Sequence, residues 1–527
     1  MRASATGDRV RESPGHTPTA GLLCVGALLC VMSGCATVGP DYEAPDAPVA
    51  EQWLDSGASR VSSDAADHSD WWTVFQDPAL SSLVEQAQSQ NLTLRIAGLR
   101  ILEARAVLGL ALGSRYPQSQ QVNGGITAVE LSGSEATALD DPSFRVAQAT
   151  FDLGWEIDFW GRFRRAIESA DAQVGASIAD YDDVMVSLAA EVARVYVMIR
   201  TFEERLALTY ANVEAQKNAL TIAEVKFNNG AVTELDVQQA RAVLNNTQAA
   251  IPLLEASLRQ SMNALAVLLG LPPQDSSGLL AMSRGIPSAP ANVSIGVPAE
   301  LLRRRPDVRR AERTLAAQSA QIGVAAADLY PRFSLAGSVG FRSSDADLAG
   351  LTGDRSLGDL FDADSAAGFI GPFFSWNILN YGRIRNNIRV QDARFQQLLV
   401  AYRNTVLSAL AETENAIVAH LKFNDQARYL SESVTAAESS VELSLVQYRE
   451  GKTQFNRVID ALNFLFRQQD ALTTTTGDVA TSLIAMYKSL GGGYQVAEEH
   501  DATDYVADED QAQLRARTRF WRKQLAQ

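Results

Sequence analysis

The spacing of apolar residues changes twice along the chain from a helical period to a strand period, each time at a Tyr-Pro pair. A helix-like run that begins near Pro306 reaches Tyr330-Pro331, and apolar residues then occupy alternate positions from Phe333 to Phe341. The same change follows Tyr116-Pro117, where the segment QSQQVNGGITAV begins. The chain is therefore predicted to turn from helix to strand twice.

A stronger alternation follows in each half of the chain. From Ala147 to Phe159 the odd positions are apolar and the even positions are polar or glycine, which predicts a strand with one apolar face. The segment Ile370–Ile378 repeats the pattern, and Pro372 within it indicates a bend or an edge-tolerant position. Strands of soluble sandwiches alternate in the same way, so the pattern alone leaves a soluble sheet and an outer-membrane wall both open.

A long helix is predicted after each of these strands. No interior proline or other stop interrupts the segments from about Arg162 to Asn228 and from about Arg383 to Arg449, and at 1.5 Å per residue each would be on the order of 100 Å long. In each half a turn and a second helix, the return helix, are predicted after the long helix. The return helix of the second half has a heptad seam with interruptions at Gln469 and Thr476. Pro252 should kink the return helix of the first half. The first long helix carries a sustained heptad seam, which predicts left-handed supercoiling against neighbouring helices. The seam consists of Val174, Ile178, Tyr181, Met185, Leu188, Val192, Val195, Ile199, Phe202 and Leu206.

The chain contains an internal repeat. Three pairs of residues share a separation of 221 positions (376 − 155, 382 − 161, 451 − 230), namely Trp155 and Trp376, Gly161 and Gly382, and Gly230 and Gly451. The Tyr-Pro pairs are separated by 214 (331 − 117), and the difference falls in a stretch rich in Gly, Ser and Asp, where a loop is expected to vary. We predict a first repeat over residues 78–297 and a second over 298–493, preceded by an extension over 35–77 and followed by a tail over 494–527 to which no role is assigned.

Four strands are too few to close a barrel, because about eight is the practical minimum and a sheet in a membrane leaves no edge unpaired. The chain is therefore expected to oligomerise, and this argument leaves a dimer with eight strands and a trimer with twelve both open. The predicted architecture is a sheet barrel in the lipid that continues, at the Tyr-Pro and Trp-Gly junctions, into a coiled α-helical barrel in the periplasm. A cytosolic coiled coil or a four-helix bundle would explain the heptads but not the strands or the export signal described next.

The amino-terminal segment, residues 1–34, has the pattern of a secretory signal peptide. Three arginines precede an apolar run from Ala20 to Val31 that is too short for a transmembrane helix. The run ends in Met32-Ser33-Gly34-Cys35, which resembles a bacterial lipobox and implies cleavage before Cys35 and acylation of that cysteine. Ala36 follows instead of Asp, and resemblance to enterobacterial lipoproteins then implies sorting to the outer membrane. An ordinary signal peptide with an incidental cysteine is the alternative.

Composition and charge exclude several other functions. A formal charge of −16 and a pI near 4.9 argue against a nucleic-acid partner, and the basic cluster Arg303–Arg305 before Pro306 is interpreted as a solvated or ion-paired helix start. After the signal peptide only His68, His420 and His500 remain, widely separated, and no metal-spacing motif, phosphate loop or nucleophile elbow occurs. We expect no enzyme activity, no cofactor and no metal. A purely structural periplasmic lipoprotein is a further alternative.

Several motifs in order resemble the NodT-type lipoprotein branch of the TolC-like outer membrane efflux proteins, over nearly all of residues 35–493. They are CATVGPDYEAPDAPV, DWWTVFQDPALSSLVEQAQSQN, GWEIDFWGRFRRAIESADAQ and LLRRRPDVRRAERTLAAQSAQIGVAAADLYPRFSLAGSVGF, which begin at Cys35, Asp70, Gly154 and Leu301. The resemblance implies an α+β membrane protein, a homotrimer with a twelve-stranded outer-membrane barrel and a twelve-helix periplasmic tunnel. It also implies service as the exit duct of a tripartite pump for small molecules, with a periplasmic adaptor and an inner-membrane transporter of the RND type. A type I protein secretion system is the alternative.

The resemblance also implies two sets of site residues. It places adaptor contacts at the ends of the long hairpins, at Asn229, Gly230, Glu450 and Gly451, although a glycine after a helix is also a common helix end. It places a gate in the segment GKTQFNRVIDA, where Asp460 matches an acidic gate position, and Arg457 and Asn456 stand where relatives carry an Asp and an apolar residue. Arg457 lies three residues before Asp460, so an ion pair within or between protomers is expected, and a surface ion pair without a gating role is the alternative.

Overall fold

The structure is a computed structural model that describes residues 37–46, 49–62, 64, 68–132, 143–273, 277–290, 292–299, 304–345, 357–494, 501–522 and 525. The chain divides into two compact units, which are described separately. Unit 1 comprises Met1–Asp41, Ala111–Glu168 and Ala320–Gln391, and unit 2 comprises Tyr42–Leu110, Ser169–Ser319 and Asp392–Gln527.

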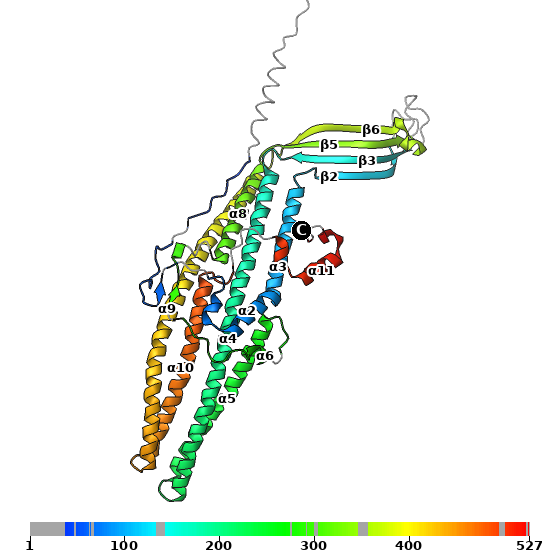
Figure 1. Cartoon of the computed structure of the whole chain (residues 1–527). Helices are drawn as coiled ribbons and strands as arrows, with labels where there is room; N and C mark the ends of the chain where they lie inside the picture. Colours follow the sequence, from blue (N-terminus) through cyan, green and yellow to red (C-terminus); the bar gives the residue numbers. More distant parts are fainter. Residues whose placement is uncertain are drawn as a thin grey trace, which may run out of the picture. The chain divides into compact units, whose positions relative to one another are not determined.

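Unit 1 contains a four-stranded antiparallel sheet in the order β2-β3-β5-β6 (Figure 1). The strands are β2 (Ser119–Glu130), β3 (Ser143–Ile157), β5 (Arg332–Ser344) and β6 (Ala366–Ser375). The strands predicted after the two Tyr-Pro pairs are β2 and β5, so both changes from helix to strand are confirmed. Among the residues that the structure describes, β2 and β6 are each paired on one side only.

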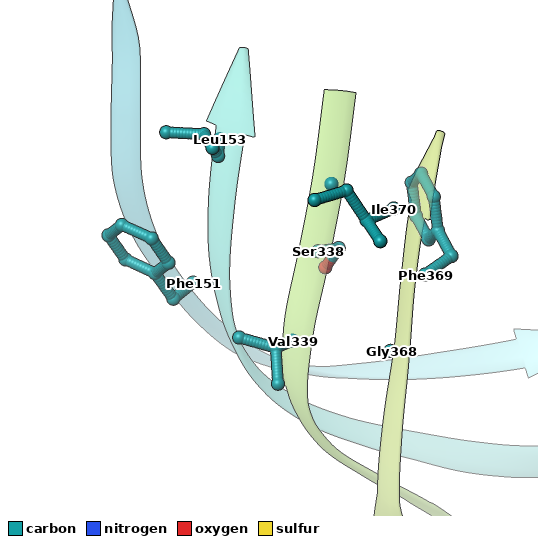
Figure 2. A pocket seen from close by; sticks show the side chains of 8 residues that line it. Phe151, Leu153, Ser338, Val339, Gly368, Phe369 and Ile370 are labelled. Atoms are coloured by element: carbon teal, nitrogen blue, oxygen red, sulfur yellow. The ribbon is translucent and has the colours of Figure 1, made fainter. Parts of the chain in front are cut away.

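The register of the sheet separates apolar from polar side chains. On one face Val122 lies opposite Phe151, and Phe151 lies opposite Val339. On the other face Asp152 lies between Gln121 and Ser338. The predicted alternation is therefore confirmed, because cross-strand neighbours share a face. A hollow of about 410 Å³ opens on the sheet beside apolar side chains and glycines (Figure 2), and it is lined by Phe151, Leu153, Gly337, Ser338, Val339, Gly368, Phe369 and Ile370.

The last strand differs from the prediction. β6 begins before Ile370 and ends at Ser375, so Trp376 and Ile378 lie beyond it. The ladder ends because the chain tightens there, where the N–H of Ile378 donates to the carbonyl oxygen of Trp376 at 3.1 Å. Pro372 lies within β6, an outer strand of the described sheet, where a missing N–H donor is tolerated.

The helices repeat in length between the two halves. α3 (Leu92–Gly113) and α8 (Pro306–Ala327) have 22 residues each. α4 (Arg162–Asn228) and α9 (Arg383–Arg449) have 67 residues each and begin and end where the sequence predicts. α5 (Glu234–Leu268) and α10 (Phe455–Ser489) have 35 residues each. The internal repeat is confirmed.

Short elements complete the described chain. They are β1 (Val61–Ser62), η1 (Trp71–Phe75), α2 (Pro78–Gln90), α6 (Ser277–Leu280), β4 (Val293–Ser294), η2 (Leu357–Phe361), η3 (Ala363–Ser365), η4 (Ala502–Tyr505), α11 (Asp508–Arg517) and η5 (Arg519–Arg522). β1 and β4 pair in parallel. Within the described residues, no helix is both long and apolar enough to span a bilayer.

The main core of unit 2 forms around α4 and the motif DWWTVFQDP. The ring of Trp71 stacks on Tyr487 of α10, with centroids 5.5 Å apart. The carboxylate of Asp77 caps α2 by accepting the N–H groups of Ala79 and Leu80, and it also accepts the Tyr196 hydroxyl at 2.7 Å. Six of the predicted seam residues of α4 are buried, namely Val174, Leu188, Val192, Val195, Ile199 and Leu206.

Polar residues that interrupt the apolar pattern have partners. Gln469, which interrupts the seam of α10, accepts a hydrogen bond from Asn212 at 2.9 Å and donates one to Glu438 at 3.3 Å.

Arg305 pairs with Asp307 and Glu412 at 2.8 Å each. The interpretation of the basic cluster as an ion-paired helix start is therefore confirmed for Arg305, whereas Arg303 lies outside the described residues.

Candidate functional site

Equivalent tryptophans join strand to helix in both halves of unit 1. The indole Nε1 of Trp155 donates to the carbonyl oxygen of Arg115 at 3.2 Å, and that of Trp376 donates to the carbonyl oxygen of Leu329 at 2.9 Å. Each acceptor immediately precedes a Tyr-Pro pair. The segment between proline and tryptophan differs in length between the halves, yet both halves make the same contact. This bond therefore fixes the end of the second strand of each half, β3 or β6, beside the start of the first strand, β2 or β5.

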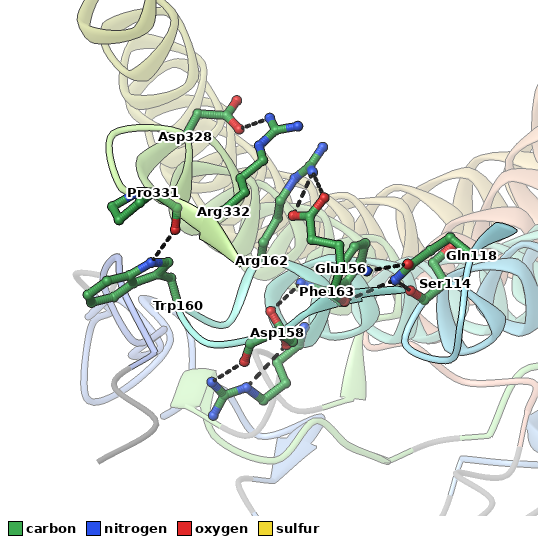
Figure 3. A network of polar contacts seen from close by, with 11 residues as sticks. Ser114, Gln118, Glu156, Asp158, Trp160, Arg162, Phe163, Asp328, Pro331 and Arg332 are labelled. Atoms are coloured by element: carbon green, nitrogen blue, oxygen red, sulfur yellow. Dashed lines mark hydrogen bonds and ion pairs between the residues drawn. The ribbon is translucent and has the colours of Figure 1, made fainter. Parts of the chain in front are cut away.

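A carboxylate caps the beginning of α4 (Figure 3). Asp158 accepts the backbone N–H groups of Phe163 at 3.0 Å and Arg164 at 2.9 Å, two donors that a helix start otherwise leaves unpaired. Nearby, Glu156 pairs with Arg162 at 3.3 Å. Gly161 precedes the helix with φ of +79°, which a residue with a side chain rarely adopts.

The same turn of α4 holds the amino-terminal strap, defined here as Thr37–Asp41. The Arg165 side chain, 4% exposed, pairs with Asp41 at 2.6 Å and with Glu168 at 2.7 Å. It also donates to the carbonyl oxygens of Val38 and Gly39 at 3.3 Å each. Burial would lower the pKa of Arg165, but the hydrogen bonds to Glu168 and Asp41 outweigh it and raise the pKa, so the guanidinium remains charged.

Two glycines let the strap lie directly on α8. Gly39 has φ of +93°, and a Cβ atom there would lie 2.4 Å from the Cα of Gly323. A Cβ atom on Gly323 would in turn lie 2.8 Å from the Cγ of Arg165. Neither position has room for a side chain. The predicted acylation site Cys35 lies outside the described residues, two positions before Thr37.

The long hairpins end in matching glycine caps. In the first, Gly230 has φ of +69°, its N–H donates to the Phe227 carbonyl at 2.8 Å, and the Ala231 N–H donates to the Lys226 carbonyl at 2.9 Å. In the second, Gly451 has φ of +75° and the Lys452 N–H donates to Gln447 at 2.8 Å. Both are Schellman caps, so the predicted helix ends are confirmed. Asn229 and Glu450 occupy the positions just before these glycines.

A lysine joins the two hairpins of unit 2 near these caps. Lys226 Nζ donates to the carbonyl oxygen of Tyr448 at 2.6 Å and lies 4.5 Å from the centre of its ring. It is also 3.4 Å from the carbonyl oxygen of Arg449. A cation there satisfies carbonyls at the end of α9 and complements the helix dipole. An apolar cluster lies behind it, formed by Ala219, Ala223, Val237, Ala240, Tyr448, Phe455, Val458 and Leu462.

Comparison with known proteins identifies the chain's family. The model of the family described as "Outer membrane efflux protein" matches residues 83–271 and 297–492. The chain belongs to this family. The two matched ranges follow the two halves of the repeat, and the α+β fold with duplicated strands and helical hairpins is that of the outer membrane efflux proteins. The family consists of outer-membrane transport proteins rather than enzymes.

Relatives in the family match over most of their length. Nodulation protein T of Rhizobium leguminosarum bv. trifolii is 31% identical over 471 residues, which is 88% of this chain and 96% of that protein. The solvent efflux pump outer membrane protein SrpC of Pseudomonas putida is 31% identical over 480 residues, 89% and 98% of the two chains. The structure of the outer-membrane channel OprN superimposes with a TM-score of 0.80 at 33% identity and covers 87% of this chain and all of that one. The resemblance to NodT-type efflux proteins is therefore confirmed.

The three predicted gate residues share the exposed side of α10. Asn456, Arg457 and Asp460 are exposed, whereas Phe455, Val458 and Leu462 on the opposite side are buried. Among the described residues of this chain, no ion pair joins Arg457 to Asp460. Sequence reasoning missed Lys226 and Arg165, because their partners are backbone oxygens and distant residues that no local spacing reveals.

The histidines and carboxylates of the described chain provide no metal centre. No group of three or more His, Cys, Asp or Glu side chains in these residues is placed to hold a metal ion. His420 is buried, and its Nδ1 lies 3.3 Å from both the Val479 carbonyl and the Ser482 hydroxyl. Burial lowers the pKa of His420, which keeps the ring neutral and fits a packing role between α9 and α10.

Proposed function

We propose that three copies of this chain close a twelve-stranded barrel and form the exit duct of a tripartite efflux pump in the outer membrane. The observation that supports this most strongly is the open sheet in a member of the outer membrane efflux protein family. The sheet has one apolar face and two outer strands, β2 and β6, each paired on one side only among the described residues. A sheet in lipid requires every edge to be paired, and neighbouring copies supply the missing strands.

The cargo is proposed to be small molecules or ions. Relatives are named as outer membrane proteins of solvent efflux, toluene efflux and pyoverdine export, and another is named as a cation efflux system protein. In this proposal an inner-membrane transporter of the RND type and a periplasmic adaptor deliver the cargo, and the duct conducts it passively. The duct is tested by native mass spectrometry of the purified protein and by planar-bilayer recording. A trimer that conducts ions is expected, and a monomer without conductance would refute it.

The adaptor is proposed to contact the hairpin tips at Asn229, Gly230, Glu450 and Gly451. Both glycines are open to solvent, since a Cβ atom on either would meet no heavy atom within 4 Å. Cysteines placed at Asn229 and Glu450 should cross-link to the adaptor in cells. Capture of the adaptor only from cysteines in the strands of the sheet would contradict this site.

The gate is proposed to involve Asp460, Arg457 and Asn456. Their side chains are exposed in the single chain and are therefore available to face the copies around the tunnel axis. Three carboxylates on one axis repel unless a cation lies between them, and Arg457 of a neighbouring copy would supply one. Asp460→Ala, and more strongly Arg457→Ala with Asp460→Ala, should raise single-channel conductance in an intact trimer. Unchanged conductance in both variants would place the constriction elsewhere.

The mature protein is proposed to be anchored in the outer membrane by lipid on Cys35. The lipobox supports this, and so does the strap, because Thr37–Asp41 is held firmly only two residues after the cysteine. Mass spectrometry of the mature amino terminus should find an acylated Cys35. An unmodified terminus at another residue would refute the anchor.

A further inference from the structure

The carboxy-terminal tail is a folded element of unit 2. Its segments η4, α11 and η5 lie against α3 through a small core of Leu102, Val506 and Leu525, with Leu99, Leu514 and Trp521 packed around it. The Tyr505 ring meets the edge of Tyr181, with centroids 5.0 Å apart. A Cβ atom on Gly98 would lie 1.9 Å from the Tyr505 carbonyl oxygen, so the tail touches the backbone of α3.

Acidic residues of the tail are used for this attachment. Asp510 forms a two-pronged pair with Arg95 of α3, with both N–O distances at 2.8 Å. Glu509 pairs with the same guanidinium at 3.1 Å, and Asp501 lies 3.6 Å from Arg105. Hydrogen bonding to Arg95 lowers the pKa of Asp510. Of these acidic side chains Asp510 is the one shielded by the contact, at 15% exposed, whereas Glu509 remains 67% exposed.

Three arginines of the described tail are open to solvent. Arg517, Arg519 and Arg522 are exposed, and none of them forms an ion pair with any residue that the structure describes. Phe520 lies among them and is 76% exposed, with the Arg519 guanidinium 5.4 Å from the centre of its ring. In a chain with a formal charge of −16, this group forms an unusual basic and aromatic surface. We name Arg517, Arg519, Phe520 and Arg522 the tail patch.

We propose that the tail patch binds the anionic glycan of the cell wall, peptidoglycan. This inference rests on the proposed function, which places the helical unit in the periplasm, where a duct must pass the wall. Peptidoglycan carries carboxylates on its peptide stems, which exposed guanidinium groups pair with, and sugar rings, whose apolar faces stack on aromatic side chains. The patch offers both kinds of group side by side.

The geometry favours a glycan over a lipid surface. Binding to a bilayer scales with the apolar area that enters it. Phe520 is the one large apolar side chain of the patch. Its neighbour Trp521 packs against the core of Leu102 and Leu525 and adds no apolar area to the patch.

Sedimentation with purified peptidoglycan sacculi tests the proposal. The full-length protein in detergent should pellet with sacculi, less so as salt is raised, and should remain in solution after the sacculi are digested with muramidase. Arg519→Glu with Arg522→Glu should weaken binding at least about tenfold, and Phe520→Ala about threefold. The matched control Lys422→Glu with Arg428→Glu reverses two exposed charges on α9, changes the net charge equally, and should bind like the parent.

The outcomes separate this inference from the proposed function. Each preparation is also recorded in a planar bilayer, and all variants should conduct as the parent does. A conducting parent that does not pellet with sacculi, or a tail-patch variant that pellets as well as the control, would overturn the inference alone. Binding to phosphatidylglycerol vesicles but not to sacculi would also overturn it, in favour of a lipid surface. Loss of conductance in the parent would instead refute the duct.

Discussion

Replacement of Arg165 by methionine should release the amino-terminal strap. Methionine keeps most of the apolar stem of the side chain and removes the guanidinium, so the packing against Gly323 is largely retained. The lost contacts to the strap are the ion pair with Asp41 and the two hydrogen bonds to the carbonyl oxygens of Val38 and Gly39. The pair with Glu168 lies within α4 and does not hold the strap.

The magnitude follows from these three contacts. Asp41 is 92% exposed, so its ion pair is worth less than about 1 kcal/mol despite the short distance. The two hydrogen bonds to backbone oxygens are long, at 3.3 Å, and contribute about 0.5–1 kcal/mol each. The free energy needed to open the strap should therefore fall by about 2 kcal/mol. This corresponds to hydrogen exchange about 30-fold faster at amides that exchange through this opening.

Hydrogen exchange at the Val38 amide measures this opening. That N–H donates to the Trp160 carbonyl at 3.1 Å, so it is protected only while the strap is closed. The matched control is Arg162→Met, which removes a similar guanidinium paired with Glu156 and should leave Val38 exchange unchanged. The reasoning fails if Arg165→Met changes the exchange of Val38 by less than twofold, or if Arg162→Met speeds it equally.

Three further predictions concern the tips and the tail. Gly451→Ala should cost about 1 kcal/mol, because the φ of +75° is strained for alanine although its Cβ has open space, and exchange at the Lys452 amide should rise about fivefold. Lys226→Met should raise single-channel conductance by loosening the two hairpins, whereas Lys217→Met, whose partner Glu214 is on the same helix, should not; equal conductance in both would refute the link. Pairing with Arg95 holds the pKa of Asp510 below the ordinary aspartate value. Attachment of the tail should therefore be stable above the ordinary aspartate pKa and should weaken as the pH falls through the lowered pKa. A tail whose sensitivity to protease does not change with pH would contradict this.

Much of the fold was accessible from sequence because it depends on local periodicity. The absence of an interior proline or other stop located α4 and α9, and the offset of 221 positions between Trp155 and Trp376 revealed the duplication. Alternation in β3 predicted which face is apolar, since successive side chains of a strand must point to opposite sides. Glycine after each long helix predicted the caps, because a left-handed residue ends a helix at little cost.

The tertiary structure alone decided the features that join distant residues. Alternation continues through Trp376 and Ile378, yet β6 stops at Ser375, since a strand ends where its partner can no longer pair with it. The contact of Arg165 with the strap spans more than a hundred positions and ends on backbone oxygens, which leave no trace in side-chain periodicity. The tail shows no helical or strand period of its own, and its fold depends on α3, which supplies the arginine and leucines that hold it. A sequence determines local conformation through neighbouring residues, whereas contacts of this kind exist only once the chain has brought separate elements together.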